Sequence, residues 1–407
     1  MSRTPSSKLL SMNILFDQTE AQATYFNGAA EYAQALFLQM ISQLNNHPEV
    51  TLFSLYSSAR SFRYQALSPE SLESNSRVIP VDYRKKSLKQ IVKENHIDLL
   101  FVTCAQSFCD LPLGDLSRIG CKVVLVIHDM YVEEMASSKI EYLYYLSHPW
   151  RMVYNLLGRI KVRLFSGTMT SRPVLMRKLI EDNDSVIVTV SNYTKQSIEY
   201  FFPTLRERIH VFYSPMKACP QESEKIDNRE LREIVENNRK YFLLLSADRI
   251  TKNGEKMLRA FKHYAEYNDP TALIVTTGCP KSLFPQHVAL PFLTSSDINH
   301  AYRHCHALLY PSFFEGFGYP PVEAMQYGKP VVSSNVCSMP EILGNSPIYF
   351  SPIYESSMYG ALLSFNATPY EQLQKKAEEQ FCAIKEKQLD DLQRLSTMLL
   401  NGSFINM

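Results

Sequence analysis

The sequence predicts an α/β protein with two doubly wound, parallel-sheet domains. Short apolar runs alternate with helical patterns, which is typical of parallel sheets that are covered by helices on both faces. This alternation is interrupted by the polar stretch 221–240 and resumes after it. The 407 residues, 45% of them hydrophobic, are enough to bury two cores of ordinary domain size.

The first domain is expected to cover 1–220. Its first apolar run is followed by Asn27 and Gly28, which open a probable helix, and Gly28 permits a tight turn there. We predict seven strands in this domain, separated by helical or loop segments. They are 12–17, 50–56, 77–83, 97–103, 122–128, 186–191 and 209–215.

The second domain is expected to cover 221–368 and to repeat the same plan. The remaining tail, 369–407, is charged and amphipathic and has no strand signal, so we expect a helix that folds back across the groove between the domains. The predicted strands of the second domain are 241–247, 271–278, 288–294, 306–312 and 329–335.

Composition argues against several classes of protein. The net charge is +1, so no overall field draws the chain toward nucleic acid. The apolar runs are shorter than the roughly 20 residues that span a bilayer, and the opening residues lack the apolar core of a secretory signal. Eight cysteines without a CxxC pair suit reduced thiols better than a disulfide framework or a zinc site. We therefore expect a cytoplasmic protein.

The most informative stretch is 313–332. Its double proline at 320–321 suits the first turn of a helix, which we expect to end at Gly328. Gly316 and Gly318 let the backbone just before this helix approach a ligand closely. The free N–H groups at the helix start therefore form a predicted anion site of the kind that holds a diphosphate.

Two glutamates, Glu315 and Glu323, lie eight positions apart in this stretch. Glu315 falls in the loop, and we expect Glu323 in the first turn of the helix. Both carboxylates would repel a phosphate, so they must serve another part of the ligand. Carboxylates accept hydrogen bonds from vicinal hydroxyls, and we predict that they bind those of a sugar or a ribose beside the diphosphate.

The whole stretch resembles the E-x7-E signature of retaining GT-B glycosyltransferases, specifically glycosyltransferase family four. Typical members read a strand, then PS-x-x-EGFG-x-P-x-EA-M-x-x-G-x-PV-x-x-S, and then PE-x-x-G. So many positions in register make chance agreement remote. The matching residues are Pro311, Ser312, Glu315 to Gly318, Pro321, Glu323, Ala324, Met325, Gly328, Pro330, Val331, Ser334, Pro340, Glu341 and Gly344.

The resemblance implies a GT-B fold, in which two Rossmann-like domains face one another across a cleft. It also implies roles for the residues of the stretch. Glu315 would contact the hydroxyls of the transferred sugar, and Glu323 would bind the ribose of the nucleotide. The N–H groups of Gly316, Phe317 and Gly318 would bind the sugar and the donor diphosphate.

A second segment, 246–261, resembles the strand-to-loop element in which an arginine and a following lysine grip the donor diphosphate. Here these residues are Arg249 and Lys252. Breaking the bond between sugar and phosphate leaves extra negative charge on the nucleoside diphosphate. Cations that are fixed around it in advance lower this barrier, so the two residues would assist the reaction.

The first domain shows weaker matches. Asn27-Gly28 resembles the glycine loop that faces the donor, and Val190–Lys195 resembles a VS-x-x-(S/T)-K turn of the family. Ile127–Asp129 resembles a segment whose histidine, here His128, lies near the transferred sugar. The resemblance therefore adds His128 to Glu315 as a predicted catalytic residue.

The function that the resemblance implies is a hexosyltransferase (EC 2.4) of surface polysaccharide or glycoconjugate biosynthesis. It would move a sugar from a nucleotide-diphosphate donor to a saccharide or lipid-linked acceptor, with retention of configuration and without a metal or a cofactor. The Asp-x-Asp pair that metal-dependent transferases use occurs once, at Asp182 and Asp184, outside these motifs. We interpret it as a polar turn that ends a helix.

Other interpretations of the same residues stay open. Glu315 and Glu323 could be an acid of a surface loop and an ordinary acid of a helix start, which the helix dipole favours. Arg249 and Lys252 could be solvated, and His128 could be a structural histidine. A non-catalytic GT-B-like partner that only binds nucleotide sugars is the alternative function. An NAD-linked oxidoreductase would need a GxGxxG fingerprint after the first strand, and the sequence has none there.

A basic segment, 150–180, carries seven basic residues and no acidic one. Val153, Leu157, Ile160 and Leu164 share one helical face of it. Such a segment can rest on the anionic inner face of a membrane, where a lipid-linked acceptor would be found. A core-facing helix with a solvated edge is the alternative interpretation.

Overall fold

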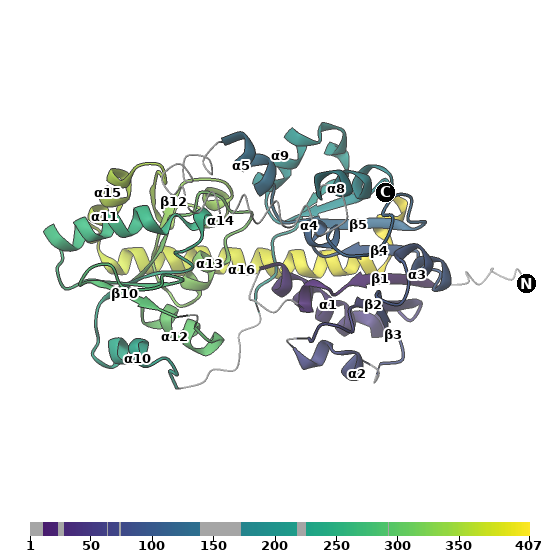
Figure 1. The fold of residues 1–407 in the computed structure, drawn as a ribbon, viewed down its shortest axis with the longest axis horizontal. Coiled ribbons are helices and arrows are strands. Elements are labelled where there is room, and N and C mark those ends of the chain that lie inside the picture. Colours follow the sequence, from purple (N-terminus) through teal and green to yellow (C-terminus); the bar gives the residue numbers. More distant parts are fainter. Residues whose placement is uncertain are drawn as a thin grey trace, which may run out of the picture.

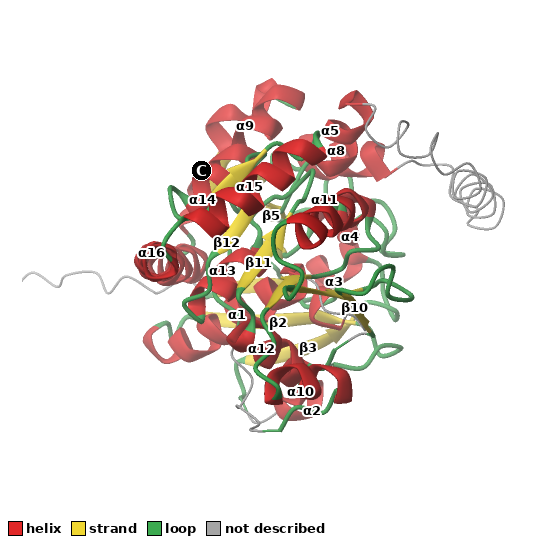
Figure 2. Ribbon diagram, turned by 90° about the vertical axis from the view of Figure 1, so that its left-hand side faces the viewer, coloured by secondary structure: helices red, strands yellow, loops and turns green. Residues whose placement is uncertain are grey.

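The computed structural model describes residues 11–22, 28–62, 64–72, 75–138, 172–217, 225–291 and 293–407. Within these ranges the chain forms two parallel sheets that lie side by side (Figure 1). The strand order is β3-β2-β1-β4-β5-β6-β7 in the first sheet and β10-β9-β8-β11-β12-β13 in the second. Helices lie on both sides of the strands (Figure 2), as the continuous apolar runs of the sequence require.

The first sheet contains one strand from each of the seven predicted runs. Its strands are β1 (Met12–Asp17), β2 (Val50–Tyr56), β3 (Val78–Asp82), β4 (Leu99–Val102), β5 (Lys122–Ile127), β6 (Val186–Thr189) and β7 (Ile209–Val211). The described helices between them are α1 (Gly28–Gln43), α2 (Pro69–Leu72), α3 (Leu88–Glu94), α4 (Ala105–Phe108), α5 (Tyr131–Ser138), α8 (Arg172–Glu181) and α9 (Asn192–Phe201).

The second sheet has one strand more than the sequence predicts, because β13 is too short to stand out as an apolar run. Its strands are β8 (Tyr241–Leu244), β9 (Leu273–Thr277), β10 (His287–Leu290), β11 (Ala307–Tyr310), β12 (Val331–Ser334) and β13 (Ile348–Phe350). Its helices are α10 (Arg229–Glu236), α11 (Gly254–Tyr267), α12 (Ser295–His304), α13 (Tyr319–Gln326), α14 (Met339–Leu343) and α15 (Glu355–Ala367).

One predicted strand, 288–294, ends earlier than expected. Strand β10 stops at Leu290 because Pro291 cannot donate a hydrogen bond to the ladder. β10 is also the edge strand of its sheet. An edge position tolerates such a short strand.

The two sheets share one hydrophobic core on one of their faces. Side chains of a strand alternate between faces, so Leu15 packs in a separate cluster while its neighbours Ile14 and Phe16 point the other way. The cluster of Ile14 and Phe16 also holds Leu243 of β8. The core is therefore continuous from the first sheet to the second on that face.

The tail forms one long helix, α16 (Tyr370–Leu400), that covers this shared core. It runs along both sheets (Figure 1) and packs against α13 and then α1. Gln39 of α1 donates a hydrogen bond of 2.7 Å to Gln393 of α16. The helix thus lies against both domains.

The predicted turn at 182–184 ends α8, as expected. The Asn183 amide donates hydrogen bonds to the carbonyl groups of Leu116 and Leu179, and Asp184 adopts a left-handed conformation with φ of 48°. Within the described ranges, no group of three or more His, Cys, Asp or Glu side chains is placed to hold a metal ion.

The basic segment 150–180 lies mostly outside the described residues, which resume at 172 with α8. Its contact with a membrane stays a prediction. Of the helices in the described ranges, none combines the length and the apolar character that crossing a membrane requires.

Candidate active site

Each sheet has one point at which the strand order reverses, between β1 and β4 in the first and between β8 and β11 in the second. The loops that leave the carboxyl ends of two such strands run in opposite directions and leave room for a ligand. In the second sheet, these loops carry the predicted residues Arg249, Lys252 and Glu315.

The loop after β8 folds back on itself before α11 begins. Arg249 precedes a single 3-10 turn that ends at Lys252, and Asn253 is left-handed with φ of 52°. Gly254 then starts α11 so close to Ala247 that any Cβ there would collide with the Ala247 backbone. The tight turn fixes the backbone from which Arg249 and Lys252 project.

Lys252 and Glu315 form the central contact of the site. The Lys252 Nζ atom lies 2.5 Å from a carboxylate oxygen of Glu315 and 2.9 Å from the hydroxyl of Tyr310. The two charged side chains are only 12% and 14% exposed. A pair so poorly hydrated is held by its mutual charge, and either member alone would be costly to bury.

The backbone after Glu315 presents N–H groups in the way that the motif predicts. Gly318 has φ of +88° and precedes α13 directly. Among the described residues, none accepts a hydrogen bond from the N–H groups of Gly316, Phe317 or Gly318. Three donors beside the start of a helix suit an anion.

Glu323 is the fifth residue of α13 and lies in its second turn, so the predicted place in the first turn is wrong. The helix begins one residue before the double proline, which shifts Glu323 along it. Its carboxylate accepts a hydrogen bond of 2.6 Å from Tyr302 and forms an ion pair with Lys217. The Lys217 ammonium also lies over the ring of Tyr319, 4.9 Å from its centre.

Tyr310 ends β11, and its hydroxyl contacts Lys252, the partner of Glu315. Burial raises the pKa of its hydroxyl well above the ordinary value, and both Glu315 and Glu323 raise it further. Glu315 and Lys252 thus lie at the carboxyl edge of the second sheet, and Glu323 lies in the helix that follows their loop.

His128 brings the first domain to this region. It follows β5, one of its ring nitrogens lies 2.9 Å from the carbonyl oxygen of Thr103, and its ring packs edge-on against Tyr32 at 5.1 Å. Burial lowers the pKa of His128, which favours the neutral imidazole. Gly316 packs so tightly on the backbone of His128 that a side chain at 316 would collide with it.

Asp129 lies beside these residues of the second domain. Burial raises the pKa of Asp129, Glu315 raises it further, and Arg249 lowers it. A Cβ at Gly316 would lie 3.2 Å from the Cβ of Asp129, so the loop that carries Glu315 meets the edge of the first sheet. The structure thus brings the motif residues of both domains together.

The donor-facing loop of the first domain is described only in part. Gly28 begins α1 as predicted, and a Cβ there would lie 3.0 Å from the ring of Tyr319. Asn27 lies outside the described residues, so its role stays a prediction.

Neither Lys217 nor Tyr302 was predicted as a partner of Glu323. Neither residue lies in a motif, and only the fold brings them to α13. A basic residue just before the polar stretch 221–240 was the single available hint of Lys217.

Residues 227–347 match the family described as glycosyl transferases group 1. The O-antigen chain mannosyltransferase RfbU of Salmonella typhimurium is 28% identical over 192 residues, which are 45% of this chain and 51% of that protein. The O-antigen chain mannosyltransferase B of Escherichia coli is 43% identical over 63 residues, 16% of each chain. The chain thus covers half of the first relative and less of the second.

Solved structures resemble almost the whole chain. HepE of Anabaena in complex with UDP-glucose has a TM-score of 0.61 at 15% identity, over 96% of this chain and 100% of that one. The glycosyltransferase WaaG, involved in lipopolysaccharide biosynthesis, has a TM-score of 0.59 at 14% identity, over 97% and 100%.

The solved structures and the two parallel sheets show a GT-B fold, and the matches in sequence support a glycosyltransferase. The segment that matches the glycosyl transferases group 1 carries Arg249, Lys252, Glu315 and Glu323. The resemblance drawn from the motif is thereby confirmed.

Proposed function

We propose that the protein transfers a hexose-type sugar from a nucleotide-diphosphate donor to a saccharide or lipid-linked acceptor. The observation that carries this proposal is the contact between Lys252 and Glu315 beside three available N–H groups, at the switch point of the second sheet. This arrangement offers cations to a diphosphate and a carboxylate to hydroxyls within one small volume.

Arg249, Lys252 and the N–H groups of 316–318 would bind the diphosphate. Negative charge grows on this group as the bond to the sugar breaks. Donors whose positions are fixed beforehand stabilise that charge without reorganising, and the tight backbone at Gly254 and Gly318 fixes them here.

The two glutamates would bind hydroxyl groups on either side of the diphosphate. Glu315 directly precedes Gly316, which packs against His128, so we assign Glu315 to the transferred sugar, together with His128. Glu323 lies toward Lys217 and Tyr302, and we assign it to the ribose. Each carboxylate would exchange part of its present contacts for hydroxyl groups of the donor.

We further propose that transfer retains the anomeric configuration and requires neither a metal nor a cofactor. In this mechanism, the acceptor attacks from the face that the diphosphate leaves, and the leaving phosphate accepts the proton of the acceptor. The charge on the leaving group would be met by Arg249 and Lys252.

We propose surface polysaccharide assembly as the setting, because the relatives that share the motif region are O-antigen chain mannosyltransferases. Mannose is accordingly the first sugar to test. A cytoplasmic location and a contact of 150–180 with the inner membrane face are part of the same proposal.

The proposal is tested by nucleotide sugars that differ in base and sugar, such as GDP-mannose and UDP-glucose. We expect one of them to raise the melting temperature and to release its nucleoside diphosphate when an acceptor is present, also in EDTA. NMR of the product then reports the anomeric configuration. Binding without release for every donor and acceptor offered would favour the non-catalytic partner instead.

A further inference from the structure

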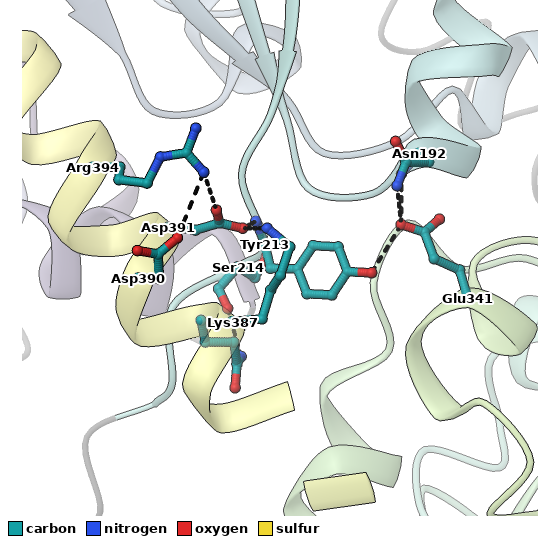
Figure 3. A network of polar contacts seen from close by, with 9 residues as sticks. Asn192, Tyr213, Ser214, Glu341, Lys387, Asp390, Asp391 and Arg394 are labelled. Carbon is teal, nitrogen blue, oxygen red and sulfur yellow. Dashed lines mark hydrogen bonds and ion pairs between the residues drawn. The ribbon is translucent and has the colours of Figure 1, made fainter. Parts of the chain in front are cut away.

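A single carboxylate, that of Glu341, joins the second domain to the start of α9 in the first (Figure 3). One of its oxygens accepts hydrogen bonds from the backbone N–H of Asn192, at 2.8 Å, and from the Asn192 side chain, at 2.9 Å. The other oxygen accepts from the N–H of Tyr193, at 2.9 Å. Glu341 belongs to α14, so all three bonds cross from one domain to the other.

A carboxylate suits this position for a physical reason. The first N–H groups of a helix have no partner within the helix, and they carry the positive end of its dipole. Bonds from such groups to a charged acceptor are stronger than bonds between neutral groups. Glu341 therefore holds α9 more firmly than a neutral side chain would.

Tyr213 connects this contact to α16 and to the loop 315–318. Its hydroxyl donates a hydrogen bond of 3.1 Å to Glu341, and its backbone N–H donates one of 2.8 Å to the buried Asp391 of α16 (Figure 3). Its ring packs edge-on against Phe317 at 5.6 Å. Loss of the Glu341 carboxylate would thus also release the ring of Tyr213, which supports the loop 315–318.

The same two segments hold the backbone of the loop itself. Ser191, just before α9, donates a hydrogen bond of 2.7 Å to the carbonyl oxygen of Gly316. Ser338, just before α14, donates one of 2.9 Å to the carbonyl oxygen of Glu315. Both carbonyl groups are thus tied to residues within three positions of the contact made by Glu341.

We propose that Glu341 is a positioning residue. It holds the start of α9 against the loop 315–318, and so keeps this loop packed against His128. Its loss would lower the rate of transfer while the donor still binds to the second domain. The effect on rate rests on the proposed function, whereas the effect on the arrangement of the domains does not.

The test compares Glu341→Ala and Glu341→Gln with the control Asp297→Ala. Asp297 is also a carboxylate that accepts two backbone N–H bonds, from Asp227 and Asn228, but it acts within the second domain. We measure kcat and the donor Kd with the donor that the wild type uses, and the maximum dimension by small-angle X-ray scattering.

We expect Glu341→Ala to lower kcat about tenfold or more, because small misplacements of reacting groups are costly, and to leave the donor Kd within about threefold. Glu341→Gln keeps an oxygen for the Asn192 N–H and should lose less. Asp297→Ala should lower the melting temperature while kcat stays within about twofold.

An unchanged kcat in Glu341→Ala, a loss of donor affinity in place of kcat, or an equal loss of kcat in Asp297→Ala would overturn the proposal. If Glu341→Ala does not fold, an unchanged kcat in Glu341→Gln would overturn the proposal instead. If the wild type transfers no sugar, the proposed function fails, but scattering still tests whether Glu341 holds the two domains together. Glu341→Ala should then show a larger maximum dimension than wild type and control, and an equal dimension would contradict the inference.

Discussion

The switch points of the two sheets have the same topology and opposite chemistry. In the first, Asp17 ends β1 in a fully buried position and accepts hydrogen bonds from Thr19 and Thr103. The described parts of the loops there, 18–22 and 103–105, contain no Lys or Arg. In the second, Lys252 pairs with Glu315, the available N–H groups follow Glu315, and Arg249 lies in the same loop as Lys252.

The difference teaches that topology offers two places for a ligand and that charge selects between them. An anionic diphosphate is favoured where fixed cations and helix N–H groups meet. The first edge has a buried carboxyl group and neutral hydroxyls instead, so a neutral acceptor suits it better. Three predictions test this comparison, from the largest expected effect to the smallest.

Replacing Glu315 tests whether the second edge performs the chemistry. We expect Glu315→Ala to lower the rate of transfer by about a hundredfold or more, because a group that is fixed at the reacting sugar is lost. The nucleoside diphosphate should still bind, since Lys252 is freed rather than removed. Release of the diphosphate and its Kd measure the two effects.

Glu355→Ala is the matched control, because Glu355 is an acid of the same domain that pairs with Arg259 at the surface. Its turnover should equal that of the wild type. Normal turnover in Glu315→Ala would reject the role of Glu315 and would leave the two edges undistinguished.

Asp17 tests the chemistry of the first edge through pH. Burial raises its pKa from 3.8 to about 6. A raised pKa in the folded state means that stability is full below the unfolded pKa and is lost as pH rises through the folded one. We expect this residue alone to lower the free energy of unfolding by about 2 kcal/mol between pH 4 and pH 6.

Urea unfolding between pH 4 and pH 6 measures how steeply the free energy of unfolding falls with pH. Asp17→Asn should make this slope smaller. Asp82 ends β3 and serves as the control. Burial pushes the pKa of Asp82 up, but hydrogen bonds from Ser58 and Arg84 outweigh it and hold the pKa below its ordinary value. Asp82→Asn should therefore leave the slope as in the wild type. A slope in Asp17→Asn equal to that of the wild type would contradict the raised pKa of Asp17.

Arg249 tests the cationic side of the second edge. Arg249→Ala should weaken binding of the nucleoside diphosphate roughly tenfold to hundredfold, as expected for the loss of hydrogen bonds to a charged group. Calorimetry at two salt concentrations measures it. Arg259→Ala removes the same charge from α11, away from the loop, and should change the Kd little. Equal losses in both variants would mean that only the overall charge matters.

Much of the fold followed from local sequence. Strands such as β4, β6, β8 and β11 are buried along their whole length, and they appear in the sequence as unbroken apolar runs. The start of α13 was predictable because Gly318 and the double proline obey local backbone rules. Strand β13 escaped because three residues carry no periodic signal.

The site was predictable where its residues belong to one motif or to neighbouring loops of one sheet. Lys252 and Glu315 meet because the loops of β8 and β11 leave adjacent strands, and Arg249 lies in the first of these loops. Lys217 could not be foreseen as the partner of Glu323, because it reaches α13 from the segment between the sheets.

The sequence by itself determined the class of fold and the identity of the motif residues that lie at the switch point of the second sheet. Burial periodicity, turn residues and helix starts are local properties, and they are written in short stretches of chain. The tertiary structure alone decided that Asp17 is fully buried and that Glu341 contacts Asn192, 149 positions away. Such facts depend on how two sheets and α16 pack together, and no local preference of the backbone contains that information.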